Sequence, residues 1–300
     1  MRGQRATGVI HVPAGVDPAY DIPVAVIHGA KPGPVLAVVA GSHGTEYASI
    51  LAIEELMATA PRSPIDPATL SGTLILVPLV NVASFERLTP HVNPVDNKSM
   101  NRFYPGSATG TQTERASFAM TKEVVDQCDH LIDLHGGDLD ENLRPYSYWT
   151  VTGDKKQDDM SKGMVLAFGL DHIIVSSDRP TDPAASRFLE NTASTRSKPS
   201  ITAEAGRSGP VEATDVTLLV NGIRGVMAYL KMTTDAVKLV TNPIWVEQIV
   251  SIAAEQDGIF YPAVSRDAHV TKGDRIGTVR DYFGKTIAEL SAPDTGIIMA

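Results

Sequence analysis

The stretch Val35–Glu46 reads VLAVVAGSHGTE, and it is the strongest single indication of the fold. Its first part, Val35–Ala40, is an almost unbroken aliphatic run, which is typical of a strand covered on both faces in a parallel sheet. The run breaks at Gly41, and His43 and Glu46 follow closely. Because ligands of open α/β sheets bind outside the carboxyl ends of strands, these two side chains are candidates for a functional site.

Strand-like and helix-like segments alternate on both sides of this stretch, up to about residue 230. Such alternation predicts an α/β fold whose sheet is mostly parallel or mixed and is flanked by helices. Further strands are predicted at Gly8–Val12, Ile22–His28, Leu74–Val80, Leu131–Leu134, His172–Val175 and Ser200–Glu204. Helices are predicted at Tyr47–Ala58, Thr111–Gln127, Asp158–Gly169, Pro183–Thr195 and Val211–Leu230.

Two regions depart from this alternation. Ala83–Gly110 is long, irregular and rich in Pro and Asn, and loops of that length are usually functional or disordered. After about Thr241, glycines separate short β-like runs, which is typical of a small β-rich domain. We therefore expect a main domain at residues 1–240, which carries the site, and a β-rich C-terminal domain at residues 241–300.

Composition and charge exclude several functional classes. The chain has 26 Lys+Arg against 35 Asp+Glu, a net charge of −9, and no stretch gathers enough basic residues to follow phosphates. Its apolar runs are far shorter than the roughly 20 residues that span a bilayer, and the start lacks a secretory signal. The single cysteine, Cys128, suits a reducing compartment and is expected to act as a small buried hydrophobe. We expect a soluble, cytoplasmic protein without nucleic-acid or membrane partners.

Three predicted strands are followed or ended by residues of complementary chemistry. His43 and Glu46 follow one strand, His135 stands just after the second and Glu204 ends the third. Two imidazoles and one carboxylate are the ligand set of a catalytic zinc, with a fourth position left for water. Glu204 is then free to act as a general base. The alternative is that His43 and His135 merely hold loops together.

Four motifs occur along the chain in a fixed order: GSHGTE at Gly41–Glu46, NRFYPG at Asn101–Gly106, DLHGG at Asp133–Gly137 and TAEAG at Thr202–Gly206. Together they resemble the succinylglutamate desuccinylase/aspartoacylase family, zinc deacylases with the zinc-carboxypeptidase fold. The resemblance runs through most of the chain. It includes Gly258–Ile298, which is similar to the β-domain appended in that family. The nearest similarity is to bacterial predicted deacylases rather than to either founding enzyme.

The resemblance implies one zinc ion per chain. Its ligands would be His43, Glu46 and His135. It also implies that Glu204 is the general base and acid, and that Asn101 and Arg102 bind a carboxylate of the substrate. The planar fork of an arginine matches a carboxylate bidentately, which agrees with that role. A surface salt bridge is the alternative for Arg102.

The sequence departs from the family pattern in three places. Phe103-Tyr104-Pro105 stands where the family has Phe directly before Pro, which is a mild change. The family uses an arginine upstream of the Asn-Arg pair to polarise the scissile carbonyl. Arg87 is our candidate for it, with a plain surface role as the alternative, and His91 is the fallback. The chain stops soon after Ile298, so we expect the last strands of the β-domain to be missing or shortened.

Further residues near the motifs have two interpretations each. Asp133 lies two positions before His135, so on a strand both point to one face and the carboxylate can orient the imidazole. A buried polar role at the sheet edge is the alternative. Arg144, Tyr146 and Tyr148 follow the HGG loop and are candidates to line the substrate cleft or to pack.

These residues predict a zinc-dependent amidohydrolase that removes the acyl group from a small N-acylated amino acid or a similar amine. In this hypothesis Glu204 activates a zinc-bound water and then protonates the leaving amine. One alternative is a metallocarboxypeptidase that acts on peptides. Another is a non-catalytic binding protein on the same scaffold, although all four zinc-ligand and base positions carry suitable residues. A homo-oligomer is compatible with the sequence.

Overall fold

The computed structural model describes residues 2–58 and 65–300, which divide into two compact units. The first unit holds the chain up to Glu141 and the segment Pro145–Glu247. The second unit holds Asn142–Arg144 and Gln248–Ala300. The main division therefore follows Glu247, whereas the sequence analysis placed its boundary after residue 240.

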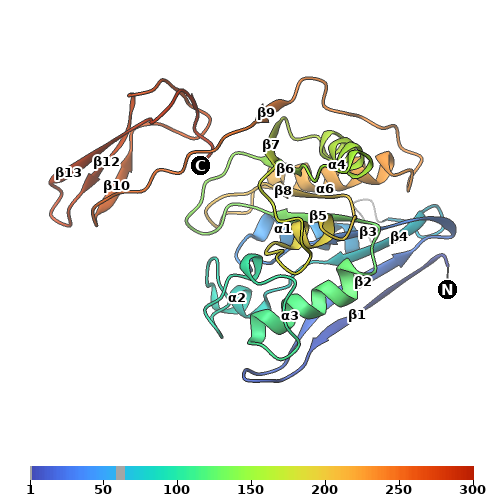
Figure 1. Cartoon of the computed structure of the whole chain (residues 1–300). Coiled ribbons are helices and arrows are strands. Elements are labelled where there is room, and N and C mark those ends of the chain that lie inside the picture. The colour runs from blue at the N-terminus through green and yellow to red at the C-terminus, as the bar shows by residue number, and fades with distance from the viewer. Residues whose placement is uncertain (1, 59–64) are drawn as a thin grey trace. The chain divides into compact units, whose positions relative to one another are not determined.

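A mixed sheet forms the centre of the first unit (Figure 1). Among the described residues it has nine strands in the order β1-β2-β4-β3-β5-β8-β6-β7-β9. The neighbouring strands β4, β3, β5 and β8 run parallel to one another. Three pairs are antiparallel: β1 with β2, β2 with β4, and β6 with β8. The bounds are β1 Gln4–Val12, β2 Tyr20–His28, β3 Lys31–Val39, β4 Ser71–Val77, β5 His130–His135, β6 Tyr146–Thr150, β7 His172–Ser176, β8 Ser200–Glu204 and β9 Ile244–Val246.

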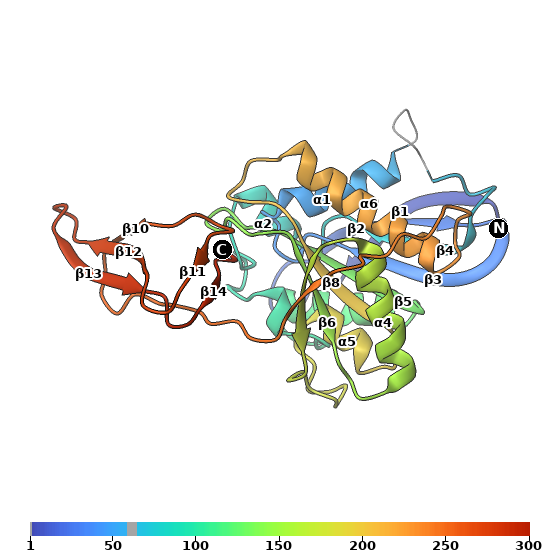
Figure 2. The same ribbon diagram turned by 90° about the horizontal axis from the view of Figure 1, so that it is seen from above.

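Helices cover both faces of the sheet (Figure 2). Along β3, Leu36 and Val38 face one hydrophobic core and Ala37 and Val39 face the other, which explains its unbroken aliphatic sequence. The helices α1 (Tyr47–Met57), α4 (Lys155–Phe168) and α6 (Ala213–Tyr229) pack on the first core. The helices α3 (Gln112–Met120) and α5 (Leu189–Ser194) pack on the second. The expected α/β fold, a mixed sheet flanked by helices, is confirmed.

Some predicted elements differ in detail from the structure. The predicted strand Leu74–Val80 ends at Val77, because Pro78 has no N–H to continue the ladder. The predicted helix Pro183–Thr195 is wrong in its first half, since α5 begins only at Leu189. The sequence analysis did not predict β6 or the short helices α2 (Val82–Arg87) and Met100–Arg102. Cys128 is buried in the second core as expected, and burial raises the pKa of its thiol to about 12.

The second unit is rich in β-structure, as expected. The strands β10 (Ile259–Pro262), β12 (Arg275–Arg280) and β13 (Thr286–Ser291) form an antiparallel sheet, and β11 (His269–Val270) pairs with β14 (Gly296–Ile297). Its small core contains Val270, Ile276 and Ala292. The segment Asn142–Arg144 is held in this unit, because Arg266 donates to the Leu143 carbonyl and Arg144 pairs with Asp267.

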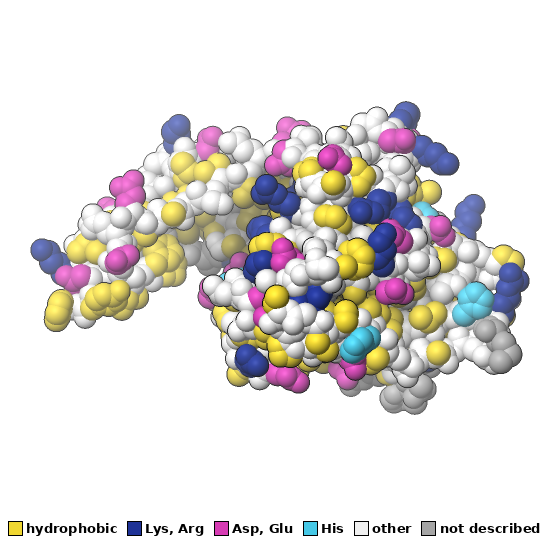
Figure 3. All heavy atoms as spheres, turned by 60° about the horizontal axis from the view of Figure 1, so that its bottom comes forward, with side chains coloured by type: hydrophobic (Ala, Val, Ile, Leu, Met, Phe, Trp, Pro, Cys, Tyr) yellow, Lys and Arg dark blue, Asp and Glu magenta, His cyan; other side chains and the backbone are white. Residues whose placement is uncertain are grey.

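The surface carries charged and hydrophobic side chains (Figure 3). On the face drawn there, acidic and basic side chains are interspersed. The second unit exposes hydrophobic side chains, among them Phe260, Tyr282 and Phe283. Across residues 2–58 and 65–300, none of the helices combines the length and hydropathy that crossing a bilayer requires.

Candidate metal centre and active site

The parallel strands β3, β5 and β8 bring the predicted residues to one edge of the sheet. His43 and Glu46 lie in the turn between β3 and α1. His135 ends β5 and Glu204 ends β8, and these two residues are direct partners in the register of the two strands. The pairing of β3 with β5 and of β5 with β8 therefore brings motifs that are far apart in the sequence to the same edge of the sheet.

The carboxylate of Glu46 lies between two imidazoles. Its Oε1 is 2.6 Å from Nδ1 of His43, and its Oε2 is 2.9 Å from Nδ1 of His135. The Gly136 N–H also donates to Oε2, at 3.2 Å. One ligand atom from each of the three side chains lies within 4.8 Å of the other two. The donor set and this convergence fit a single zinc ion, whose nitrogen and oxygen ligands sit at about 2.0–2.2 Å.

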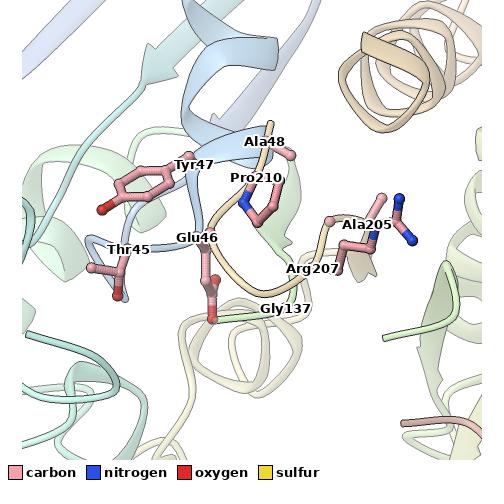
Figure 4. Close-up of a pocket in the computed structure, with 10 residues that line it drawn as sticks. Thr45, Glu46, Tyr47, Ala48, Gly137, Ala205, Arg207 and Pro210 are labelled. Atoms are coloured by element: carbon pink, nitrogen blue, oxygen red, sulfur yellow. The ribbon is translucent and has the colours of Figure 1, made fainter. Parts of the chain in front are cut away.

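The environment keeps Glu46 ionised. Burial would by itself raise the pKa of this carboxyl group, but the imidazoles of His135 and His43 outweigh burial and lower it to about 2. Figure 4 shows the carboxylate pointing toward the Gly137 backbone, away from the Tyr47 side chain. Glu46 also borders a small hollow that is lined in part by Tyr47, Ala205 and Pro210. An ionised, buried carboxylate beside two imidazoles is suited to hold a cation.

The second nitrogen of each imidazole is also engaged. Nε2 of His43 is 3.2 Å from the Ser99 hydroxyl. Nε2 of His135 is 2.7 Å from Nδ2 of Asn101 and 3.3 Å from Oδ1 of Asp133. These contacts fix the ring orientation that turns Nδ1 toward Glu46. Asn101, expected to contact substrate, thus also touches a candidate metal ligand.

Glu204 has the opposite electrostatics to Glu46. Burial raises the pKa of its carboxyl group to about 8, against the opposing effect of His135. The carboxylates of Glu46, Glu141 and Asp133 contribute to the rise. A carboxyl group with a pKa near neutral can both accept a proton and return it, which is the property of a general base and acid.

The structure separates the two candidates for the carbonyl-polarising residue. Arg87 is exposed at the end of α2, and no contact joins it to the three candidate ligands within the described part of the chain. The ring of His91 lies next to that of His43, with centroids 6.2 Å apart. Its Nε2 is 2.8 Å from Asp140 and its Nδ1 is 3.3 Å from Asp138.

Two neighbouring carboxylates favour the charged form of the His91 imidazole. Burial lowers the pKa of its imidazole, but the carboxylates of Asp138 and Asp140 outweigh burial and raise it. Asp138 is fully buried, and it also accepts hydrogen bonds from the His91 N–H at 2.8 Å and from the Thr45 hydroxyl. The sequence analysis missed Asp138 and Ser99, although Asp138 directly follows the HGG motif.

The remaining predicted residues lie in different places. Arg102 is exposed on the short helix Met100–Arg102, and its guanidinium lies 4.9 Å from the centroid of the Phe188 ring. Tyr146 and Tyr148 are on β6, and their rings meet edge to face at 5.5 Å. Tyr146 pairs with Glu204 in the sheet register. Arg144 belongs to the C-terminal unit.

Comparisons with known proteins find both sequence and structural relatives of this chain. Residues 32–230 match the family model described as the succinylglutamate desuccinylase/aspartoacylase catalytic domain. A curated relative, the N-alpha-acetyl-L-2,4-diaminobutyric acid deacetylase of Halomonas elongata, is 24% identical over 288 residues, which cover 94% of this chain and 81% of the relative.

Solved structures show the same fold. The product-bound ectoine utilization protein EutE (DoeB) from Ruegeria pomeroyi aligns with a TM-score of 0.87 at 22% identity, covering 100% of this chain and 90% of that one. A succinylglutamate desuccinylase from Silicibacter sp. TM1040 aligns with a TM-score of 0.86 at 21% identity, covering 99% and 89%. At these identities the alignments establish the fold of the chain.

Proposed function

The chain belongs to the succinylglutamate desuccinylase/aspartoacylase family, and on that premise we propose that it is a zinc-dependent amidohydrolase of small N-acyl amino acids. The observation that carries the proposal is the convergence of His43, Glu46 and His135 within 4.8 Å, with Glu204 in register beside His135. The name of the Halomonas elongata relative, a deacetylase of an N-acetylated amino acid, supports the same reaction class.

The three converging side chains would hold the zinc ion. Bound there, zinc would supply a Lewis acid that polarises a carbonyl oxygen and lowers the pKa of water toward about 7. The contacts of Ser99, Asn101 and Asp133 hold the two imidazoles in the orientation this binding needs.

The protein's own groups would carry the proton transfers. Glu204 would accept a proton from the attacking water and return it to the nitrogen of the leaving amine. Because burial and neighbouring carboxylates raise its pKa to about 8, the protonated form needed for the second transfer is accessible near neutral pH.

Substrate positioning would rest on Asn101 and Arg102, whose donors suit the carboxylate of the amino-acid part. We assign the stabilisation of the developing oxyanion to His91 ahead of Arg87. His91 lies beside His43, and Asp138 and Asp140 favour its charged form. A positive charge next to the carbonyl oxygen stabilises the transition state most where water is excluded.

The test combines metal analysis with an activity screen. Protein purified without added metal should contain close to one zinc per chain. The variant His135→Gln should lose the metal, whereas His130→Gln, at the opposite end of the same strand, should retain it. The metal-loaded protein should release free amine from N-acyl amino acids and leave dipeptides intact.

Three results would overturn the proposal. Zinc that is absent and cannot be restored by incubation would remove the proposed electrophile. Hydrolysis of dipeptides in preference to N-acyl amino acids would favour a carboxypeptidase. Binding of N-acyl amino acids without turnover by the zinc-loaded protein would favour a binding protein.

A further inference from the structure

We propose that Asp138 is a positioning residue of the proposed reaction, and that it holds the His91 ring where that ring stabilises the oxyanion. The inference rests on the proposed function, because it deepens the role assigned there to His91. Asp138 directly follows the DLHGG motif and belongs to none of the four motifs. Its side chain is fully buried, in the loop that follows β5.

The backbone of His91 has an unusual conformation. Its φ is +61°, in the left-handed region, which residues with a Cβ atom seldom adopt. Such a conformation persists where the surrounding contacts hold it. Oδ2 of Asp138 supplies one of these contacts, because it accepts the His91 N–H at 2.8 Å. Asp138 therefore stabilises the backbone conformation that sets the direction of the His91 side chain.

The same carboxylate oxygen also contacts the His91 ring. Oδ2 of Asp138 lies 3.3 Å from Nδ1, so one atom restrains both the backbone and the imidazole. The other ring nitrogen, Nε2, lies 2.8 Å from Asp140, whose side chain is 67% exposed. Water and salt weaken an exposed contact, whereas a buried contact is screened much less. Asp138 is thus the lasting restraint on the ring, and Nε2 becomes available when Asp140 turns to solvent.

The second oxygen of Asp138 is bound to the turn that carries two candidate zinc ligands. Oδ1 accepts hydrogen bonds from the Thr45 hydroxyl and from the Leu139 N–H, the latter at 2.7 Å. Thr45 lies in the same turn as His43. Asp138 therefore joins the turn after β3 to the loop that carries His91. This link holds the His91 ring beside that of His43, with the centroids 6.2 Å apart.

An amide at position 138 cannot replace the carboxylate. The two oxygens of Asp138 face two backbone N–H groups, one hydroxyl and one imidazole nitrogen. An asparagine offers one oxygen, and its NH₂ group would face donors instead of acceptors. Some of these contacts would therefore separate, and the His91 ring would shift. A misplacement of about 1 Å in a positioned group costs about 10²-fold in rate.

We expect Asp138→Asn to lower kcat about tenfold to a hundredfold and to change KM less, because the oxyanion develops only in the transition state. Steady-state kinetics of the zinc-loaded protein on the best N-acyl amino acid measures both constants. Zinc content should stay the same, since Asp138 is not one of the three converging ligands.

Asp158→Asn is the matched control. Asp158 also holds a loop, because it accepts the Thr152 N–H at 2.8 Å and the Thr152 hydroxyl at 2.7 Å. That loop lies beyond the end of β6 that is farther from Glu204. The control variant should therefore keep the wild-type kcat.

A double-mutant cycle shows whether Asp138 acts through His91. In the His91→Gln background, Asp138→Asn should cause no further loss, because the group that it positions is gone. A merely structural role would lower kcat by the same factor in both backgrounds. Thermal unfolding of each variant shows whether the fold is retained. Should Asp138→Asn fail to fold, Thr45→Val removes only one donor to Asp138, and its loss of kcat should depend on His91 in the same way.

The outcomes separate this inference from the proposed function. Wild-type kcat in Asp138→Asn, or an undiminished loss in the His91→Gln background, would overturn the inference and leave the hydrolase intact. If the wild type hydrolyses no substrate, the proposed function fails, and crystal structures of the wild type and Asp138→Asn then decide the inference. A His91 ring that moves by about 1 Å or more relative to His43 supports it. A ring that keeps its place contradicts it.

Discussion

Glu46 and Glu204 are carboxylates at the same edge of one sheet, yet their pKa values lie on opposite sides of the ordinary value. Two imidazoles outweigh burial at Glu46 and lower its pKa to about 2. Burial and like charges dominate at Glu204 and raise its pKa to about 8. The first group is suited to bind a cation and the second to move a proton.

The role of Glu204 leads to a prediction about rate. Glu204→Gln should lower kcat about 10²–10⁴-fold, because it removes the group that transfers the proton. Zinc content should stay the same, since Glu204 is not one of the converging ligands. Glu190→Gln is the control, because it replaces another buried carboxyl group with a raised pKa. Wild-type kcat in Glu204→Gln would contradict the assignment.

His91 and Arg87 give a second prediction at the same scale. His91→Gln should lower kcat/KM by at least about tenfold, because it removes positive charge beside the candidate metal ligand His43. Arg87→Gln should change it little, since Arg87 is exposed at the end of α2. Steady-state kinetics on the best substrate compares them directly. A larger loss in Arg87→Gln would return the polarising role to the arginine.

At the scale of elements, the site depends on close approach between the ends of β5 and β8. A Cβ atom added at Gly136 would lie 2.3 Å from the Ala205 carbonyl oxygen, a distance at which the backbone must move. Gly136 also donates its N–H to Glu46. Gly136 therefore has two roles. Its missing side chain lets the ends of β5 and β8 approach closely, and its N–H helps to position Glu46.

We predict that Gly136→Ala lowers the free energy of unfolding by about 1–3 kcal/mol, as overpacking does, and weakens zinc binding. Denaturant unfolding and a competitive chelator titration measure these two effects. Gly8→Ala is the control, because a Cβ at Gly8 meets nothing within 4 Å. An unchanged zinc affinity in Gly136→Ala would show that the strand ends tolerate displacement.

At the scale of the whole molecule, the chain passes from the first unit to the second through an exposed segment without regular structure. This segment lies between β9 and β10 and contains Glu247 and Glu255. Proteases cut exposed, irregular backbone first, because regular elements must open before cleavage.

A glutamate-specific protease should therefore cut first after Glu247 or Glu255. Mass spectrometry of early time points should find fragments that begin at Gln248 or Gln256. Glu46 and Glu190, both buried, serve as internal controls that should stay uncut. Earlier cleavage within the first unit, with the segment between β9 and β10 still intact, would contradict this prediction.

The accuracy of the sequence predictions followed the strength of the local pattern. Val35–Ala40 is aliphatic throughout, and Leu131–Leu134 places aliphatic side chains on both faces although Asp133 interrupts it, so their strands were predicted within a few residues. β6 was missed, because YSYWT is short and its aromatic residues fit packing or a binding cleft equally well. The predicted helix from Pro183 failed because turns around Asp182 and Ser186 occupy its first residues.

The sequence by itself determined the α/β class, the candidate zinc ligands His43, Glu46 and His135, and Glu204 as their neighbour. These properties are local, because each residue ends a strand or lies in the turn that follows one, and parallel pairing brings strand ends together. Only the tertiary structure decided that the His91 ring lies beside that of His43. It also decided that the guanidinium groups of Arg102 and Arg179 both lie near the Phe188 ring. Those contacts connect irregular segments, whose paths depend on packing and charge rather than on a repeating pattern.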